Sequence, residues 1–253
     1  MEFNNLIEKK IMINNIPTIV LTPRKDSKLY PTIIFYHGWG STIEKQRFRG
    51  FILCSLGYQV MIPCAIYHGE RNPIEHSNPD NAGRYFWEVI LNNIGESNSI
   101  IEYAINNLSA DPDRVGVSGN SMGGFTAAGI FTSNQDVKAL VVFNGSCNWE
   151  YSNKIFMKAL NITDGNVPKE LQEEMDKYDP MKNLNLIIDR PILFLHGDND
   201  TIVDIGAQKE FYEKVFPLYG DSSKICLVGY PKLNHFVTTN MMEEAAIWFN
   251  KYL

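Results

Sequence analysis

A serine with a glycine two residues before it and another two residues after it stands at the centre of residues 114–129. The apolar run 115–117 before it predicts a strand, and the small residues after it predict a helix. A chain that turns from strand to helix at one residue forces that residue into a strained conformation with positive φ. Side chains two positions away on either side would then collide, so both positions need glycine. The motif Gly119-Asn-Ser-Met-Gly123 therefore predicts a strand that leads directly into a helix.

Ser121, at the centre of this motif, is the candidate nucleophile. The turn lifts its hydroxyl to the N-terminus of the following helix, where a developing negative charge is favoured. A glycine-rich turn with an accidental serine is the alternative interpretation. The strand before the motif and the helix after it favour the nucleophile.

Apolar and amphipathic segments alternate along the rest of the chain. Residues 8–14 and 16–23 predict an antiparallel pair of strands joined by a tight turn. Further apolar runs are typical of strands buried on both faces of a parallel sheet. These runs are 31–36, 58–64, 137–143, 191–195 and 224–228. Because helical patterns separate them, the sequence predicts a single α/β domain, 1–253, with a doubly wound, mostly parallel sheet.

Two of the intervening helices have boundaries that can be predicted. Ser41 followed by Glu44 is a capping box that indicates a helix start, and Gly57 indicates its end. The expected apolar stripe of this helix is Phe48, Phe51, Ile52 and Leu56. A second helix is expected at about 85–108.

The segment 146–185 is longer than the single helix with loops that a return between neighbouring strands needs. It predicts two short helices, at about 151–160 and 167–178. It leaves the sheet at the edge where ligands bind in open parallel sheets. We therefore predict a small helical cap over the candidate nucleophile, with Trp149 and Phe156 lining a substrate pocket. A surface insertion remote from the site is the alternative for the segment, and core packing is the alternative for its aromatic residues.

The candidate base comes from a short search, since the chain has five histidines. A serine hydroxyl needs a base to take its proton and an acid to hold that base in the right tautomer. With a motif of this kind the expected order is serine, then acid, then histidine. Only His196 and His235 follow Ser121 in the sequence. Of these two, only His235 has an acidic residue at a strand end between Ser121 and itself. His235 is therefore the candidate base, and a surface-loop histidine is the alternative.

Three aspartates that follow the run 191–195 are candidates for the acid. Asp204 is well placed to cap the next helix. Asp198 comes directly after a glycine and can serve the turn. Asp200 is therefore the candidate acid, with Asp198 as the reserve.

Acyl transfer also needs two N–H donors for the negatively charged oxygen of the transition state. The amide of Met122, directly after the candidate nucleophile, is one expected donor of this oxyanion hole. The other is expected from the glycine-rich loop 37–40, which follows the run 31–36. We assign it to the amide of Trp39.

The composition argues against several other classes of protein. A net charge of −6 argues against nucleic acid or an anionic membrane as the main partner. No apolar run approaches the length of a membrane span, and the N-terminal residues carry no signal-peptide pattern. Four scattered cysteines without a C-x-x-C pair indicate a reduced, cytoplasmic protein without a metal site. No zinc-protease, Walker A or dinucleotide-binding motif is present, so no cofactor is expected.

Four motifs of the chain carry a resemblance to a known superfamily. They are His37-Gly-Trp-Gly40, Gly119-Asn-Ser-Met-Gly123, Gly197-Asp-Asn-Asp200 and Asn234-His235. Together they resemble the α/β-hydrolase superfamily. Residues 109–124 and the tetrapeptide His68-Gly-Glu-Arg71 resemble its prolyl-oligopeptidase-like and dienelactone-hydrolase-like branch of bacterial esterases. The resemblance implies a Ser–Asp–His triad on an eight-stranded, mostly parallel sheet, without a cofactor. Glu70 and Arg71 either anchor a substrate carboxylate or pair with each other.

The sequence therefore predicts a serine hydrolase that cleaves small acyl esters through an acyl-enzyme intermediate. An exopeptidase or amidase with the same triad is one alternative, although the chain has no room for the propeller domain of true oligopeptidases. A non-catalytic binding protein on a hydrolase scaffold is the other. The expected partner is a small-molecule ester, and the expected state is a monomer or homodimer.

Overall fold

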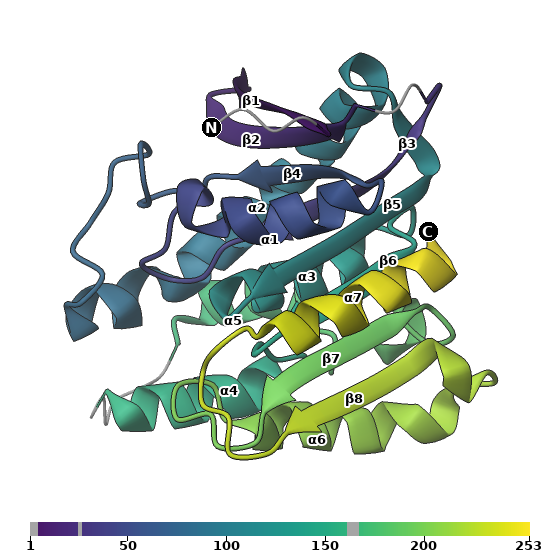
Figure 1. Cartoon of the computed structure of the whole chain (residues 1–253). Coiled ribbons are helices and arrows are strands. Elements are labelled where there is room, and N and C mark those ends of the chain that lie inside the picture. The colour runs from purple at the N-terminus through teal and green to yellow at the C-terminus, as the bar shows by residue number, and fades with distance from the viewer. Residues whose placement is uncertain (1–4, 25–26, 161–166) are drawn as a thin grey trace.

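Eight strands form one sheet in the computed structural model, which describes residues 5–24, 27–160 and 167–253. The strands are β1 (Leu6–Ile13), β2 (Ile16–Pro23), β3 (Tyr30–Tyr36), β4 (Gln59–Pro63), β5 (Ala110–Asn120), β6 (Ala139–Phe143), β7 (Ile192–Gly197) and β8 (Ile225–Tyr230). Their order across the sheet is β1-β2-β4-β3-β5-β6-β7-β8 (Figure 1). β1 is antiparallel to β2 and β2 to β4, whereas the remaining neighbours are parallel.

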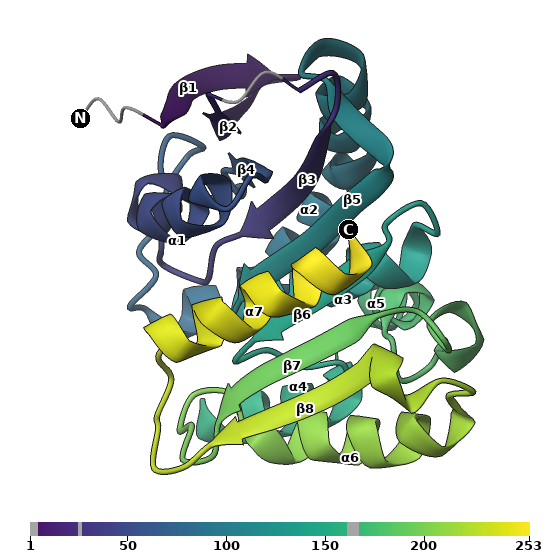
Figure 2. The same cartoon turned by 45° about the vertical axis from the view of Figure 1, so that its right-hand side comes forward.

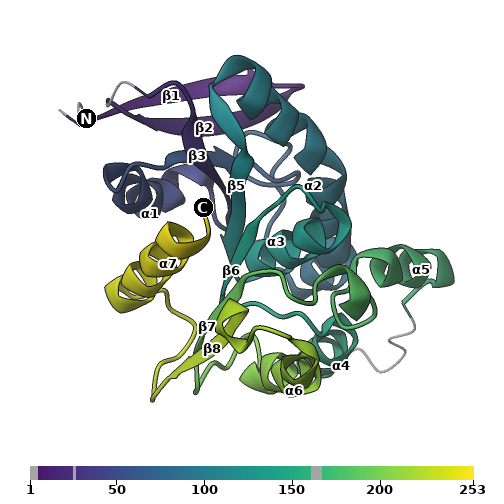
Figure 3. The same ribbon diagram turned by 90° about the vertical axis from the view of Figure 1, so that its right-hand side faces the viewer.

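Helices cover both faces of this sheet. The α-helices are α1 (Ile43–Ser55), α2 (Pro79–Asn107), α3 (Met122–Ser133), α4 (Trp149–Ala159), α5 (Lys169–Tyr178), α6 (Ile205–Val215) and α7 (Thr239–Tyr252). Short 3-10 helices occupy Leu184–Leu186, Phe216–Leu218 and Ser222–Lys224. Figures 2 and 3 show α1 and α7 on one face and α2 to α6 on the other. Among the helices of the described ranges, none is both long and apolar enough to cross a membrane.

The central strands face two hydrophobic cores, which explains their continuous apolar runs. In β6, Leu140 and Val142 pack in the core beneath α2 and α3. Val141 and Phe143 pack in the core beneath α1 and α7. Successive side chains of a strand point to opposite faces, so both sets of positions must be apolar. The predicted doubly wound, mostly parallel sheet is confirmed, together with its antiparallel edge pair.

Helix α2 begins at Pro79 rather than at about 85. Asn78 caps it, because its side-chain oxygen accepts a hydrogen bond from the amide of Asp80 at 2.9 Å. Proline suits the first helical position, since it has no N–H to leave unsatisfied. The sequence Asn-Pro-Asp at 78–80 is thus a helix start that the prediction missed.

The start of α1 differs from the prediction. Its N-cap is Thr42, which makes no side-chain capping bond, so the predicted capping box of Ser41 and Glu44 is wrong. The Ser41 hydroxyl instead accepts a hydrogen bond from the side chain of Gln46 at 2.8 Å. That contact stabilises the first turn from the side rather than from its end.

The buried face of α1 also differs from the predicted stripe. Phe48 and Leu56 are 69% and 58% exposed, so neither belongs to the core. The helix approaches the sheet at Gly50, where a Cβ atom would lie 2.6 Å from a methyl group of Leu21. Because this contact sets the rotation of the helix, the face around Gly50 and Leu53 is buried in place of the larger side chains.

The turn from β5 into α3 consists of one residue. β5 ends at Asn120, α3 begins at Met122, and Ser121 between them has φ 57° and ψ −125°. A Cβ atom on Gly119 would lie 2.1 Å from the carbonyl oxygen of Gly123. A collision is therefore present at Gly119, as the motif predicts, and the absence of a side chain there avoids it.

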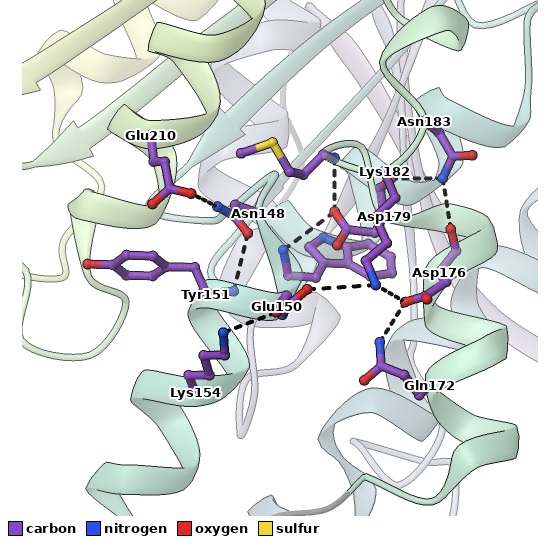
Figure 4. A network of polar contacts seen from close by, with 12 residues as sticks. Asn148, Glu150, Tyr151, Lys154, Gln172, Asp176, Asp179, Lys182, Asn183 and Glu210 are labelled. Atoms are coloured by element: carbon purple, nitrogen blue, oxygen red, sulfur yellow. Dashed lines mark hydrogen bonds and ion pairs between the residues drawn. The ribbon is translucent and has the colours of Figure 1, made fainter.

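Helices α4 and α5 form most of the segment 146–185, of which residues 161–166 lie outside the described residues. Polar contacts tie α4 to the neighbouring helix α6 (Figure 4). The side chain of Asn148 accepts a hydrogen bond from the amide of Tyr151 at 3.2 Å and donates one to Glu210 at 3.1 Å. The start of α4 is thus capped and attached to α6 by one residue.

A buried carboxylate joins the end of α5 to the start of α4. Asp179 is 2% exposed and accepts hydrogen bonds from the amides of Met181 at 2.9 Å and Trp149 at 3.5 Å (Figure 4). Burial raises the pKa of Asp179 to about 6, although both hydrogen bonds act in the opposite direction. The two helices of the segment are therefore connected by backbone amides on one buried side chain.

The contact between Gly123 and β3 leads to a prediction about stability. A Cβ atom on Gly123 would lie 2.1 Å from the backbone oxygen of Tyr36, which cannot move aside as a side chain can. We expect Gly123→Ala to lower the free energy of unfolding by more than about 3 kcal/mol in urea denaturation. Gly95→Ala in α2 is the matched control, because nothing outside the helix backbone lies within 4 Å of its added Cβ. It should raise stability by about 0.5–1 kcal/mol. Equal effects of the two substitutions would contradict the contact.

Candidate active site

The predicted site residues follow different strands but come to one edge of the sheet. Ser121 follows β5, Asp200 follows β7 and His235 follows β8. These strands are parallel, so their carboxyl ends lie at the same edge. Trp39 follows β3, which is the parallel neighbour of β5 on its other side. The fold thus gathers residues that are up to about two hundred positions apart in sequence.

Asp200 and His235 form a hydrogen-bonded pair. His235 Nδ1 lies 2.7 Å from Asp200 Oδ2. The side chain of Asp200 is 0% exposed and that of His235 is 18% exposed. An ionised carboxylate only accepts hydrogen bonds, so Nδ1 carries a proton, and in the neutral ring Nε2 keeps a free lone pair. The pair therefore presents a base at Nε2 of His235.

The surroundings of the Asp200 carboxylate keep it ionised. Oδ1 accepts the amides of Ile202 and Val203, each at 2.9 Å. His196 Nε2 lies 3.3 Å from Oδ2 and 2.9 Å from the carbonyl oxygen of Val203. Burial by itself raises the pKa of Asp200, but hydrogen bonds from His196, His235 and the Val203 amide outweigh it. The pKa is held well below its usual range, so the carboxylate can stabilise a positive charge on His235.

Two asparagines brace the loops that carry the acid and the base. Asn234 Oδ1 accepts the amide of Thr201 at 3.0 Å. Asn144, buried directly after β6, accepts the amide of Gly197 at 3.1 Å and donates to the carbonyl of Phe236 at 3.0 Å. The bracing role of these two residues is not among the predictions from the sequence. The position of Asn144 after a buried apolar run is a signal that could have found it.

The other two aspartates of the acid loop have structural roles. Asp198 is exposed and accepts the amide of Lys232 at 2.5 Å. Asp204 is the N-cap of α6 and accepts the amide of Gly206 at 2.6 Å, as expected. Of the three candidates for the acid, Asp200 is the one that contacts His235.

Two backbone amides near Ser121 have no acceptor among the described residues. They are those of Met122, the first residue of α3, and Trp39. The loop that carries Trp39 comes close to the strand–helix turn, because a Cβ atom on Gly38 would lie 3.2 Å from the Cβ of Ser121. Free N–H groups at this place are suited to a developing negative charge.

Ser121 forms part of the wall of a cavity of about 100 Å³. The wall is mostly apolar and comes from α2, α3, α4 and the loops after β3 and β7. Besides Ser121 the lining includes Trp39, Ala82, Phe86, Trp87, Phe125, Ser152, Asn153, Ile155, Phe156, Ile202, Val203 and Asp204. One side is closed by a hydrogen bond from Trp87 Nε1 to Asn153 Oδ1 at 2.8 Å, which joins α2 to α4.

The two aromatic residues expected to line the pocket lie in different places. Phe156 lines the cavity, with its ring 5.1 Å from that of Phe86. Trp149 does not line the cavity, and this corrects the prediction. It is fully buried behind Trp87, with 5.2 Å between the rings, and its indole N–H donates to the carbonyl of Ser146 at 3.2 Å. Its place at the first residue of α4 puts it in the core.

Glu70 and Arg71 lie outside the cavity lining and do not pair with each other, unlike the prediction. Glu70 pairs with Lys10 at 2.6 Å. Arg71 donates two hydrogen bonds to the carboxylate of Glu96, at 2.8 and 2.6 Å. These partners are 60 and 25 positions away in the sequence, so reasoning from the neighbouring residues could not find them.

An eight-stranded, mostly parallel sheet with a strand–serine–helix turn and an Asp–His pair at its carboxyl edge defines an α/β hydrolase. Residues 92–253 match the prolyl oligopeptidase family. The chain belongs to this family.

Several relatives match this chain over almost its whole length and almost their own. "Putative esterase YitV" of Bacillus subtilis (strain 168) is 27% identical over 252 residues, covering 95% of this chain and 97% of that protein. "Esterase YjfP" of Escherichia coli (strain K12) is 26% identical over 245 residues, covering 94% and 96%. The crystal structure of TT1662 from Thermus thermophilus has a TM-score of 0.79 at 18% identity, covering 97% of each chain. The similarity to TT1662 shows that the two chains share a fold.

The geometry of the acid loop predicts unequal effects of two similar substitutions. Asp200→Asn cannot hold His235 with its proton on Nδ1 as a carboxylate does, so we expect kcat for a p-nitrophenyl ester to fall by about 10⁴. Asp198→Asn is the matched control, since this exposed side chain contacts a loop amide and not His235. It should leave kcat nearly unchanged. The reverse ranking in steady-state kinetics would move the acid to Asp198.

Proposed function

We propose that this protein is a serine hydrolase that cleaves small carboxylic esters, with Ser121, Asp200 and His235 as its catalytic triad. The observation that carries the proposal is the buried Asp200–His235 pair at the sheet edge where Ser121 lines an apolar cavity. Membership of the prolyl oligopeptidase family supports a serine hydrolase. Similarity to two proteins named as esterases, over at least 94% of this chain, supports ester cleavage.

The first half of the proposed reaction forms an acyl-enzyme. His235 Nε2 takes the proton of the Ser121 hydroxyl while its oxygen attacks the ester carbonyl. Asp200, which stays ionised, stabilises the imidazolium. The N–H groups of Met122 and Trp39 donate to the negatively charged oxygen of the tetrahedral intermediate. His235 then protonates the leaving alcohol, and the acyl group remains on the serine oxygen.

Water completes the cycle by the same route. His235 removes a proton from a water molecule that attacks the acyl carbonyl, and the same amides hold the charged oxygen. The intermediate collapses, Ser121 regains its proton and the carboxylic acid leaves. The small, mostly apolar cavity suits a short acyl group. A small-molecule ester is therefore the proposed partner, whereas a cytoplasmic location and a monomeric or homodimeric state remain predictions from the sequence.

Amide hydrolysis by the same residues is a second candidate, because the chain belongs to the prolyl oligopeptidase family. An ester and an amide that share one acyl group separate the two candidates. We expect a higher kcat/KM for the ester. A higher value for the amide would favour a peptidase-type activity instead.

We also infer that the segment 146–185 is a cap over the site. In support, Ser152, Ile155 and Phe156 of α4 line the same cavity as Ser121. Helix α5 packs against α2 and α3 instead. We therefore assign the part of the cap that limits the acyl group to α4.

The nucleophile is tested by Ser121→Ala. Because the triad acts as a unit, we expect kcat to fall by about 10⁵–10⁶ with the fold intact by circular dichroism. Ser152→Ala is the matched control, since it removes another hydroxyl of the same lining and should keep activity. A fluorophosphonate probe should label wild type and not Ser121→Ala. A Ser121→Ala variant that keeps a tenth of wild-type turnover would exclude this nucleophile, and an unlabelled wild type would favour a binding protein.

The cap is tested by the acyl preference of Phe156→Ala. Removing this ring enlarges the cavity, so kcat/KM should rise by about fourfold per added methylene relative to an acetyl ester, from ~0.8 kcal/mol per buried CH₂. Phe48→Ala is the control, because Phe48 is 69% exposed on α1. An unchanged preference in Phe156→Ala would mean that the limiting wall lies around Trp39 and Phe86.

A further inference from the structure

Three histidines outside the proposed triad lie together beside Trp39. The ring centroids of His37 and His68 are 5.0 Å apart, and those of His68 and His76 are 4.1 Å apart. The indole of Trp39 meets two of these rings edge-on, at 5.3 Å from His68 and 4.9 Å from His76. Its N–H donates to the carbonyl of His76 at 3.0 Å. The mechanism proposed above uses none of these imidazoles.

His68 holds the backbone of this loop by a hydrogen bond of defined direction. The amide of Gly40 donates to His68 Nε2 at 3.1 Å. An amide cannot accept, so Nε2 is unprotonated and Nδ1 carries the proton of the neutral ring. Nδ1 accordingly donates to the carbonyl of Ile66 at 2.7 Å. One tautomer of His68 satisfies both contacts.

His37 holds the Gly38–Trp39 peptide, which precedes the Trp39–Gly40 peptide, in the same manner. Its Nε2 accepts the amide of Ala65 at 3.1 Å, and its Nδ1 donates to the carbonyl of Gly38 at 3.0 Å. The Gly38 carbonyl and the Trp39 N–H belong to one planar trans peptide and point in opposite directions. Fixing the carbonyl therefore fixes the direction of the N–H. The Gly38 carbonyl also accepts the amide of Ser41 at 3.1 Å. His68 fixes the next unit through Gly40, so an imidazole contacts each of the two peptides that flank Trp39.

Burial keeps both rings in the state that these contacts need. His68 is 0% exposed, and burial, together with repulsion from a protonated His37, lowers its pKa to about 3. His37 is 1% exposed, and burial lowers its pKa to about 4. The loop also has little freedom on the side of His76, because a Cβ atom on Gly40 would lie 3.2 Å from the Cβ of that residue.

We propose that His68 is a positioning residue for the oxyanion hole, because its Nε2 holds the Trp39–Gly40 peptide, which adjoins the unit that carries the Trp39 N–H. The proposal rests on the proposed function. His68 lies outside the cavity lining and acts through the loop. Without an acceptor at this place, the Gly40 N–H must turn to find another partner, and the rotated Trp39–Gly40 peptide displaces the Trp39 N–H through the Cα atom that the two units share. The stabilisation that is lost is that of the transition state, because the oxygen is charged there.

Two substitutions separate the acceptor from the rest of the ring. Gln at 68 places an oxygen near the position of Nε2 and keeps an acceptor for Gly40. Asn at 68 is shorter, so it can replace Nδ1 toward Ile66 but does not reach Gly40. We expect His68→Gln to retain kcat within about threefold. His68→Asn should lower kcat by about 10–100-fold with KM nearly unchanged, less than the 10²–10³ for deleting a donor.

A transition-state analogue provides the readout that a merely structural role would not change. A trifluoromethyl ketone with the acyl group of the substrate adds to the serine and places a charged oxygen in the oxyanion hole. Its Ki should rise in His68→Asn by the same factor as kcat falls, and it should stay near wild type in His68→Gln. Melting temperatures of both variants control for loss of fold.

The outcomes are distinguishable. Equal kcat and Ki in wild type and His68→Asn would overturn the proposal, as would a His68→Gln variant as slow as His68→Asn. A loss confined to KM would also overturn it. If His68→Asn does not fold, His68→Gln decides alone, because a more than tenfold loss there contradicts the acceptor role and retention supports it. A wild type that cleaves no ester would instead refute the proposed function.

Discussion

The backbone contact between Gly123 and Tyr36 is the constraint on which the rest of the site depends. A helix can lie this close to a neighbouring strand only where no side chain intervenes, and that closeness confines the turn between β5 and α3 to Ser121. The amide of Ser121 donates to the carbonyl of Phe143 at 2.9 Å, which attaches the turn to β6 as well. Its position is thus defined by β3, β5 and β6 together, and by main-chain atoms that leave little freedom.

Asp200 and His235, the proposed acid and base, are held by side-chain hydrogen bonds instead. They lie on loops after β7 and β8, and side-chain hydrogen bonds from Asn144 and Asn234 tie these loops to each other. The Asp200 carboxylate is the centre of this arrangement, because it accepts bonds from two backbone amides and lies against two imidazoles. Ser121 is therefore held by main-chain contacts, whereas Asp200 and His235 are held by a polar network.

The parts of the fold that the sequence could predict are those governed by local physics. Strand–helix alternation and the strained turn at Ser121 follow from patterns a few residues long, and the order of Ser121, Asp200 and His235 singled out residues of which two are in contact. The cavity wall depends on how distant elements meet. Phe156 and Trp149 look alike in the sequence, but only packing against α2 decides which one reaches the cavity. The asparagine braces escaped notice because their partners lie up to 92 positions away.

The hydrogen bond between Trp87 and Asn153 has a consequence for how such a protein can diverge. It fastens together two helices that enclose the cavity, yet neither α2 nor α4 carries the proposed acid, base or nucleophile. Selection for a new substrate can therefore remodel that enclosure by exchanging side chains on two helices while the proton-transfer apparatus is inherited unchanged. Proteins that descend from one ancestral chain can in this way share their reaction chemistry and differ in the substrate that they bind.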